Sequence, residues 1–166
     1  ADLPLPAEVT TGLSYQVTDK WMLAFDYNYT LWNIYTDLDV KFGNGTESIN
    51  PRNYKNTNTY RVGTQYVAND KFTFRAGWYF DESPVQDTYF APETPRNESM
   101  GYTGGLTYQV NPKFGIDVSL LYLHFDEIDN SYDHSTDPVS GTPNPDFGGT
   151  YKSSVFSTGV GVTYSF

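Results

Sequence analysis

The two histidines, His124 and His134, are the first residues to test for chemistry. They lie ten positions apart, and neither has a serine or cysteine nucleophile in a pattern that would make a catalytic pair. Two histidines could hold a metal ion, but solvated loop residues explain them more simply. The nearby stretch DEIDNSYD (126–133) lacks the glycine and the final glutamate of a calcium loop. The sequence therefore predicts no catalytic residue, no metal site and no cofactor.

A second group of chemically active residues is embedded in segments of alternating pattern. These are charged side chains on the polar phase of that alternation: Asp26, Arg61, Arg75, Asp81 and Asp117. In a confined interior, opposite charges pair so that none is buried alone, which is a structural interpretation. The functional interpretation is that Arg61 or Arg75 lies along the path of a substrate. Both interpretations remain open from the sequence.

The elements that must position these charges are strands. Apolar residues recur at every second position, and no helical period of useful length is present. Short turns (TDK, AND and NP) alternate with long polar segments at 43–57, 82–99 and 129–149. The pattern predicts seven strands, at 8–17, 21–42, 58–67, 71–81, 100–110, 114–128 and 150–166.

One face of the predicted strands carries no charge. Its alternate positions number 36 and include no charged residue, although the chain is 18% charged and about six would be expected. The other face holds glycine, serine, threonine, glutamine and isolated charges. A soluble sandwich would carry lysine and glutamate on its outer face, so the segregation favours a barrel whose uncharged side faces lipid.

Composition agrees with this class of protein. The net charge of −10 argues against binding to a nucleic-acid backbone. Aromatic residues make up 17% of the chain, which is typical of the aromatic girdles of outer-membrane barrels. We therefore predict an all-β fold, a transmembrane antiparallel up-and-down β-barrel in the outer membrane of a Gram-negative bacterium. The short turns would be periplasmic and the long loops extracellular.

The last ten residues, STGVGVTYSF, alternate apolar with small residues. This pattern resembles the signal that the outer-membrane assembly machinery reads. We expect the signal to consist of Val160, Val162, Tyr164 and Phe166.

Three longer stretches are similar to a known family: LPLPAEVTTGLSYQVTDKWMLAFDYNYTLW (3–32), TYRVGTQYVANDKFTFRAGWYFDESPV (59–85) and VFSTGVGVTYSF (155–166). They resemble the FadL-type outer-membrane transporters of long-chain fatty acids and other hydrophobic compounds. The most specific motif is D-x-S-P-V, which matches Asp81, Ser83, Pro84 and Val85. The long loops match the family in length only.

The resemblance implies a barrel of 14 strands with an N-terminal plug, the hatch. Residues 1–166 would then be the C-terminal half of one barrel domain, with the hatch and the first strands outside this chain. It also implies passive diffusion of a hydrophobic molecule to an interior site and out through a gap in the barrel wall.

An amphipathic carboxylate needs a cation for its head and an apolar slot for its tail. The resemblance suggests Arg52 and Lys55 by position, although ordinary exposed loop charges would look the same. Aromatic residues near the extracellular ends could form the slot or an upper girdle: Trp32, Tyr35, Tyr79, Tyr89 and Phe90.

Two other functions compete with transport. A barrel of this shape could act as an adhesin, a phage receptor or a secretion-system scaffold through its loops, and a soluble carbohydrate-binding sandwich could use the aromatic residues. For a transporter, the expected partners are a hydrophobic substrate, membrane lipid, lipopolysaccharide and the assembly machinery, with no nucleic acid.

Overall fold

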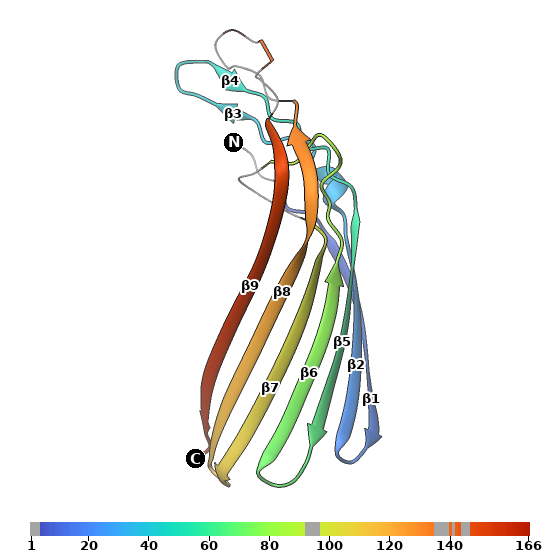
Figure 1. The fold of residues 1–166 in the computed structure, drawn as a ribbon, viewed down its shortest axis with the longest axis vertical. Coiled ribbons are helices and arrows are strands. Elements are labelled where there is room, and N and C mark those ends of the chain that lie inside the picture. Colours follow the sequence, from blue (N-terminus) through green and yellow to red (C-terminus); the bar gives the residue numbers. More distant parts are fainter. Residues whose placement is uncertain (1–3, 92–96, 135–139, 141, 144–146) are drawn as a thin grey trace.

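The computed structural model describes residues 4–91, 97–134, 140, 142–143 and 147–166. Its main element is an antiparallel sheet of seven strands in the order β1-β2-β5-β6-β7-β8-β9, so strands adjacent in the sheet follow one another along the chain (Figure 1). A two-stranded hairpin, β3–β4, forms a separate small sheet. The strands are β1 (Glu8–Thr18), β2 (Trp21–Thr30), β3 (Val40–Lys41), β4 (Glu47–Ser48), β5 (Thr57–Val67), β6 (Phe72–Asp81), β7 (Ser99–Asn111), β8 (Phe114–Tyr132) and β9 (Phe147–Tyr164).

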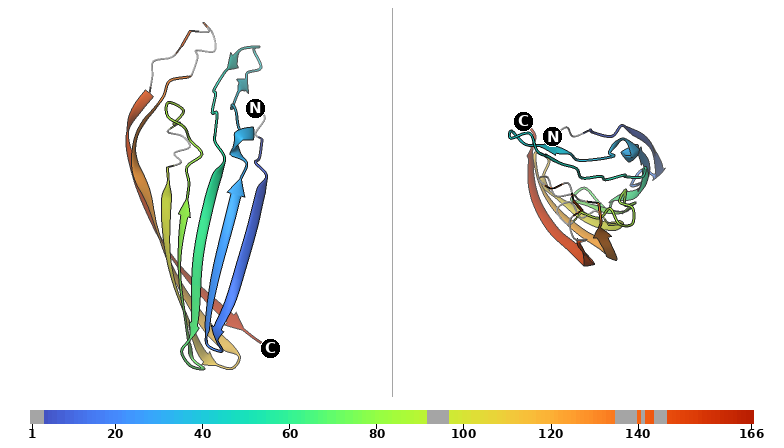
Figure 2. Two further views of the ribbon diagram at one scale, coloured as in Figure 1. Left: turned by 90° about the vertical axis from the view of Figure 1, so that its right-hand side faces the viewer. Right: turned by 90° about the horizontal axis from the view of Figure 1, so that it is seen from above.

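The seven-stranded sheet is tall and strongly curved, and it stays open along one side (Figure 2). Its short turns lie together at one end, beside the C-terminus, and the longer connections gather at the other end (Figure 1). Strands β1 and β9 are the two edges, and they do not pair with each other within the described residues. The predicted all-β, up-and-down antiparallel fold is confirmed, and this part of the chain does not close into a barrel.

The predicted segregation of the two faces is also confirmed. Strand register aligns a row of apolar side chains across six strands, and all of them are exposed on one face: Phe25, Val62, Trp78, Tyr102, Tyr122 and Phe156. A soluble domain would bury such a row because the removal of apolar surface from water drives folding. This row therefore fits a sheet whose outer face is solvated by lipid.

The predicted strand 21–42 is too long. Strand β2 ends at Thr30, and a single 3-10 turn, η1 (Trp32–Ile34), leads the chain away from the sheet. A transmembrane strand needs only 9–11 residues, so the apolar residues beyond Thr30 are free to pack elsewhere. Within the described residues, no helix is long and apolar enough to cross a membrane.

The strand predicted at 114–128 continues to Tyr132. Its pairing with β9 passes through a β-bulge, which interrupts the alternation of the sequence. Phe125 pairs with Ser153 and Ile128 with Tyr151, so Asp126 and Glu127 together face one residue of β9. One extra residue reverses the side on which later side chains point. Ile128 therefore joins Tyr151 on the inner side, where both pack against the buried loop cluster.

That cluster is a small core at the loop end of the sheet, formed by Tyr35, Tyr54, Val85 and Phe90. Phe90 is 0% exposed, and its backbone N–H donates to the Ser131 carbonyl at 2.9 Å. The segment 82–91 is thereby fastened to the extension of β8. The predicted loops 82–99 and 129–149 are described only in part, since 92–96, 135–139, 141 and 144–146 lie outside the described residues.

Candidate functional site

The concave face of the sheet holds a trough of about 710 Å³. Its floor is made of small residues because the inward positions of neighbouring strands carry glycine, alanine, serine or threonine: Ala24, Gly63, Gly77, Thr103, Gly105, Ser119 and Gly159. A barrel wall with small inward side chains leaves space for a molecule to pass. The charged side chains Asp26, Arg61 and Arg75 line the same trough.

Large inward side chains lie flat across glycines of the next strand. A Cβ atom at Gly101 would come 2.0 Å from the ring of Tyr79, and one at Gly12 would come 2.4 Å from a carboxylate oxygen of Asp26. Register places Arg61 between Asp26 on β2 and Tyr79 on β6. These three residues form a polar row on the trough wall, nearer the loop end than Arg75 and therefore called the upper row.

Arg75 forms a second, lower polar group. Its Nε donates to Gln65 Oε1 at 2.8 Å, and its Nη1 donates to Thr107 Oγ1 at 2.7 Å. The Thr107 hydroxyl donates in turn to Asp117, whose Oδ1 lies 3.9 Å from Arg75 Nη1. The Arg75 side chain is still 47% exposed to the trough. Such a network holds the guanidinium in place while leaving part of it open to a passing anionic group.

The loop end holds a packed aromatic cluster and a buried cation. Trp32, Tyr35 and Tyr54 stack edge to face, with ring centroids 5.0–6.4 Å apart. The Arg52 side chain is 3% exposed, and its Cζ lies 5.2 Å from the centroid of the Tyr132 ring. The backbone N–H of Arg52 donates to the Thr36 carbonyl at 2.7 Å. Aromatic faces attract a guanidinium, so the Tyr132 ring helps to hold the Arg52 charge inside the loop end.

Lys55 and the D-x-S-P-V motif lie against each other at this end. The Lys55 N–H donates to the Pro84 carbonyl at 2.9 Å, while the lysine residue itself is exposed. Pro84 is fully buried, Val85 belongs to the loop cluster, and the Ser83 hydroxyl accepts the Val85 N–H at 3.2 Å. Asp81 accepts from the Thr59 hydroxyl at 2.6 Å. In this structure the motif shapes the turn that enters the loop core.

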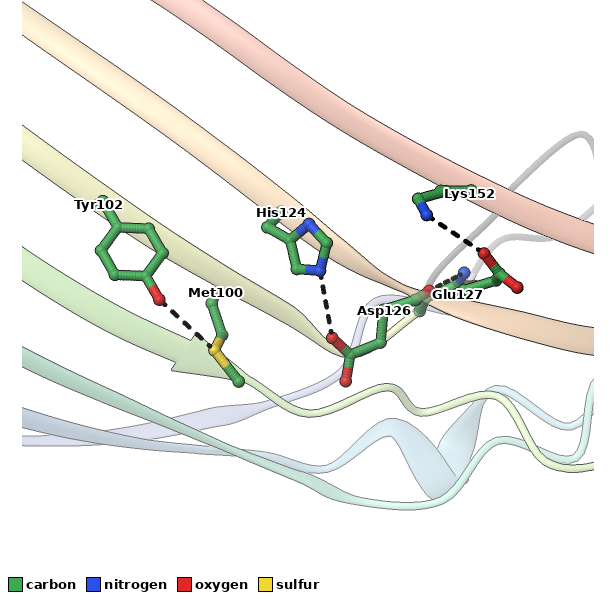
Figure 3. Close-up of polar contacts among 7 residues, drawn as sticks. Met100, Tyr102, His124, Asp126, Glu127 and Lys152 are labelled. Atoms are coloured by element: carbon green, nitrogen blue, oxygen red, sulfur yellow. Dashed lines mark hydrogen bonds and ion pairs between the residues drawn. The ribbon is translucent and has the colours of Figure 1, made fainter.

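The two histidines have separate partners. His124 Nε2 lies 3.8 Å from Asp126 Oδ1 at the bulge of β8, close to the pair of Lys152 with Glu127 (Figure 3). His134 stacks on Tyr89 with ring centroids 4.0 Å apart. Over the residues that the structure describes, no group of three or more His, Asp or Glu side chains could hold a metal ion.

The predicted site residues therefore fall into three groups. Trp32, Arg52, Lys55 and the D-x-S-P-V motif belong to the loop end. Arg61, Arg75 and Tyr79 line the trough. The four residues of the terminal pattern are exposed on the outer face of β9 or beyond it: Val160, Val162, Tyr164 and Phe166. Tyr79 lies on the wall and does not join the aromatic loop cluster.

Sequence reasoning missed three contributors to these groups: Tyr54, Tyr132 and Gln65. Tyr54 and Tyr132 are large aromatic residues in polar segments predicted as loops. An aromatic residue in such a segment indicates local packing, and this could have identified both. For Gln65, its place next to Arg75 in the strand register could not be read without the pairing itself.

Comparison with known proteins gives a consistent picture. A family model described as outer membrane protein transport protein (OMPP1/FadL/TodX) matches residues 1–166. Outer membrane protein P1 of Haemophilus influenzae is 29% identical to this chain, over 99% of this chain and 36% of the relative. The long-chain fatty acid transport protein of Salmonella typhi is 28% identical, over 66% of this chain and 25% of that protein.

Two solved structures share the fold. A FadL homologue of Pseudomonas aeruginosa superposes with a TM-score of 0.80 at 26% identity, over 96% of this chain and 35% of that one. The P. putida toluene transporter TodX gives a TM-score of 0.67 at 17% identity, over 99% of this chain and 36% of the other. The chain thus spans about a third of the length of the relatives it matches.

Proposed function

Because this chain belongs to the outer membrane protein transport protein family (OMPP1/FadL/TodX), we propose that the full-length protein moves long-chain fatty acids or other hydrophobic small molecules across the outer membrane by passive diffusion. The proposed process needs no covalent step, no cofactor and no ATP. It places the protein among transporters rather than enzymes. The long-chain fatty acid transport protein of Salmonella typhi and the toluene transporter TodX support this class of cargo.

The observation that carries the proposal is the trough on the concave face, where small side chains leave room beside a partly exposed cation. An amphipathic carboxylate could place its tail along the trough and its head at Arg75, whose side chain is 47% exposed. At the loop end, Arg52 is 3% exposed and lies over the Tyr132 ring, so it belongs to the packing of that end. Lys55 is exposed, so water weakens its contribution.

The upper part of the trough, nearer the loop end, lies on the same route. Arg61 and Tyr79 line it and would guide the cargo toward Arg75. We propose that residues 1–166 form about half of the barrel wall, with the remaining strands and a hatch in other parts of the full-length protein.

Uptake by vesicles containing the full-length protein tests this function. We expect labelled oleate or an aromatic hydrocarbon to enter without ATP, and a polar solute of similar size to stay outside. A protein that admits none of the three would instead be a loop-mediated adhesin, phage receptor or secretion-system scaffold.

Two single variants test the cation assignment. Arg75→Gln removes a charge-assisted contact and should weaken oleate binding about tenfold, whereas Lys55→Gln should change it less than twofold. Displacement of a fluorescent fatty acid from the full-length protein measures both. Binding of an uncharged hydrocarbon is the control, since Arg75→Gln should leave it unchanged. If Lys55→Gln has the larger effect, the assignment of Arg75 is wrong.

A further inference from the structure

Three short turns at the end opposite the loops share one construction (Figure 1). In each, a side-chain oxygen accepts the backbone N–H of a lysine two residues later. The pairs are Thr18 Oγ1 with Lys20 N at 3.3 Å, Asn69 Oδ1 with Lys71 N at 2.9 Å, and Asn111 Oδ1 with Lys113 N at 2.9 Å. Turns closed by a threonine or asparagine side chain fix the local backbone.

The backbone of each of these lysines is also held by the neighbouring strand or by the residue just after it. The carbonyl oxygens of Lys20, Lys71 and Lys113 accept backbone N–H groups of Val67, Gln109 and Ser165, each at 2.8 Å. All three lysines are exposed. The sheet thus presents three ammonium groups from equivalent positions along the same rim.

Each lysine is followed by an outward aromatic residue that faces a tyrosine across the strand pair. The pairs are Trp21 with Tyr66, Phe72 with Tyr108, and Phe114 with Tyr164. The rings of Phe72 and Tyr108 stack with centroids 5.1 Å apart. Such pairs mark the level where acyl chains meet headgroups. Each unit therefore combines an apolar surface, a phenolic hydroxyl and an ammonium group.

The lysines of this rim differ in their ion pairing from two lysines of the loop end, Lys41 and Lys152. Lys41 lies 3.4 Å from Glu47. Figure 3 shows the other pair, in which Lys152 lies 3.3 Å from Glu127. Within the part of the chain that the structure describes, none of the three turn lysines lies within ion-pair distance of a carboxylate, although Asp19 and Asp70 precede two of them. Their charges are available to an outside anion.

We propose that this rim binds the phosphate headgroups of anionic glycerophospholipids in the periplasmic leaflet. In outer-membrane barrels the short turns lie on the periplasmic side, where the leaflet consists of glycerophospholipids. The ammonium and tyrosine hydroxyl groups contact the phosphate, and the acyl chains lie on the aromatic pairs. The rim thereby carries its own anionic lipids, independently of which cargo the barrel admits.

Native mass spectrometry of the full-length protein tests the proposal. The protein is extracted from vesicles containing equal amounts of phosphatidylglycerol and phosphatidylcholine, and the lipids that stay bound are counted. The wild-type protein should retain phosphatidylglycerol in excess. Loss of one ammonium group should weaken lipid binding at its own turn about fivefold, the factor expected for one basic residue at an anionic surface. The excess should therefore fall in each of Lys20→Gln, Lys71→Gln and Lys113→Gln, and should fall about fivefold when all three are combined.

Two controls make the result specific. The double variant Lys41→Gln/Lys152→Gln removes the same kind of charge at the loop end and should leave the excess unchanged. The variant that combines Lys20→Arg, Lys71→Arg and Lys113→Arg keeps the charge and should preserve the excess. Heat-dependent migration in gels verifies that each variant is folded. Equal retention of the two lipids by the wild-type protein, or an unchanged excess in the folded triple glutamine variant, overturns the proposal. Fatty acid uptake by the triple variant should match the wild type, which separates this test from that of transport.

Discussion

At the scale of single residues, a glycine leaves room on the trough wall for the side chain opposite it on the neighbouring strand. Tyr79 can lie flat on the wall only because Gly101 has no side chain. The same relation links Asp26 with Gly12. On the outer face, Gly104 has open space in place of a neighbour. Gly101 and Gly12 therefore make room for the polar side chains of Tyr79 and Asp26.

This relation predicts different costs for two alanine substitutions. Gly101→Ala must displace the Tyr79 ring and should destabilise the barrel by about 1–3 kcal/mol, as overpacking does. Gly104→Ala meets nothing within 4 Å and should be nearly neutral. The urea midpoint of the full-length protein in micelles measures both. Equal midpoints for the two variants would show that Tyr79 does not rest on Gly101.

At the scale of elements, the bulge in β8 decides where the loop core forms. It places Asp126 and Glu127 together opposite a single residue of β9 and turns Ile128 inward toward the buried cluster. Phe90 then packs on Tyr151 with ring centroids 4.5 Å apart. A local irregularity in one strand thus supports a segment that is distant in sequence.

Deletion of Glu127 should undo this arrangement. Without the extra residue the alternation would continue, so Ile128 would face outward and the segment 82–91 would lose part of its support. We expect faster cleavage of 82–91 by protease in the folded full-length protein. Glu127→Gln keeps the bulge and loses only an exposed ion pair with Lys152, so its cleavage rate should match the wild type. Slow cleavage of the deletion variant would mean that the bulge does not support this segment.

At the scale of the whole molecule, the sheet is an open wall with two unpaired edges, β1 and β9, among the described residues. In hydrocarbon each unpaired backbone N–H or C=O group costs several kcal/mol. The 166-residue chain and the full-length protein should therefore behave differently in lipid.

The isolated chain should fail to form a heat-resistant barrel when it is refolded into vesicles, because its edges cannot be satisfied there. The full-length protein should form one under the same conditions. Gel migration of unheated and boiled samples measures the difference. A heat-resistant species formed by the isolated chain would show either that it closes on itself or that several copies complete the wall.

The sequence by itself determined the strands and their two faces. Successive residues of a strand face lipid and the polar interior in turn, so the apolar and polar pattern repeats every two residues along each strand, from Leu13 to Val162. The short turns were equally clear, because asparagine, aspartate and proline fix them locally. These features depend on neighbours in the chain, which the sequence displays directly.

Only the tertiary structure decided what happens at the loop end and across the trough. The packing of Tyr54 with Phe90, the stacking of Arg52 on Tyr132 and the inward turn of Ile128 join residues from separate loops and strands. Arg75 reaches Gln65 and Thr107 only because register places three strands side by side. Such contacts depend on distances between remote segments, and these are fixed by the folded sheet rather than by any local pattern.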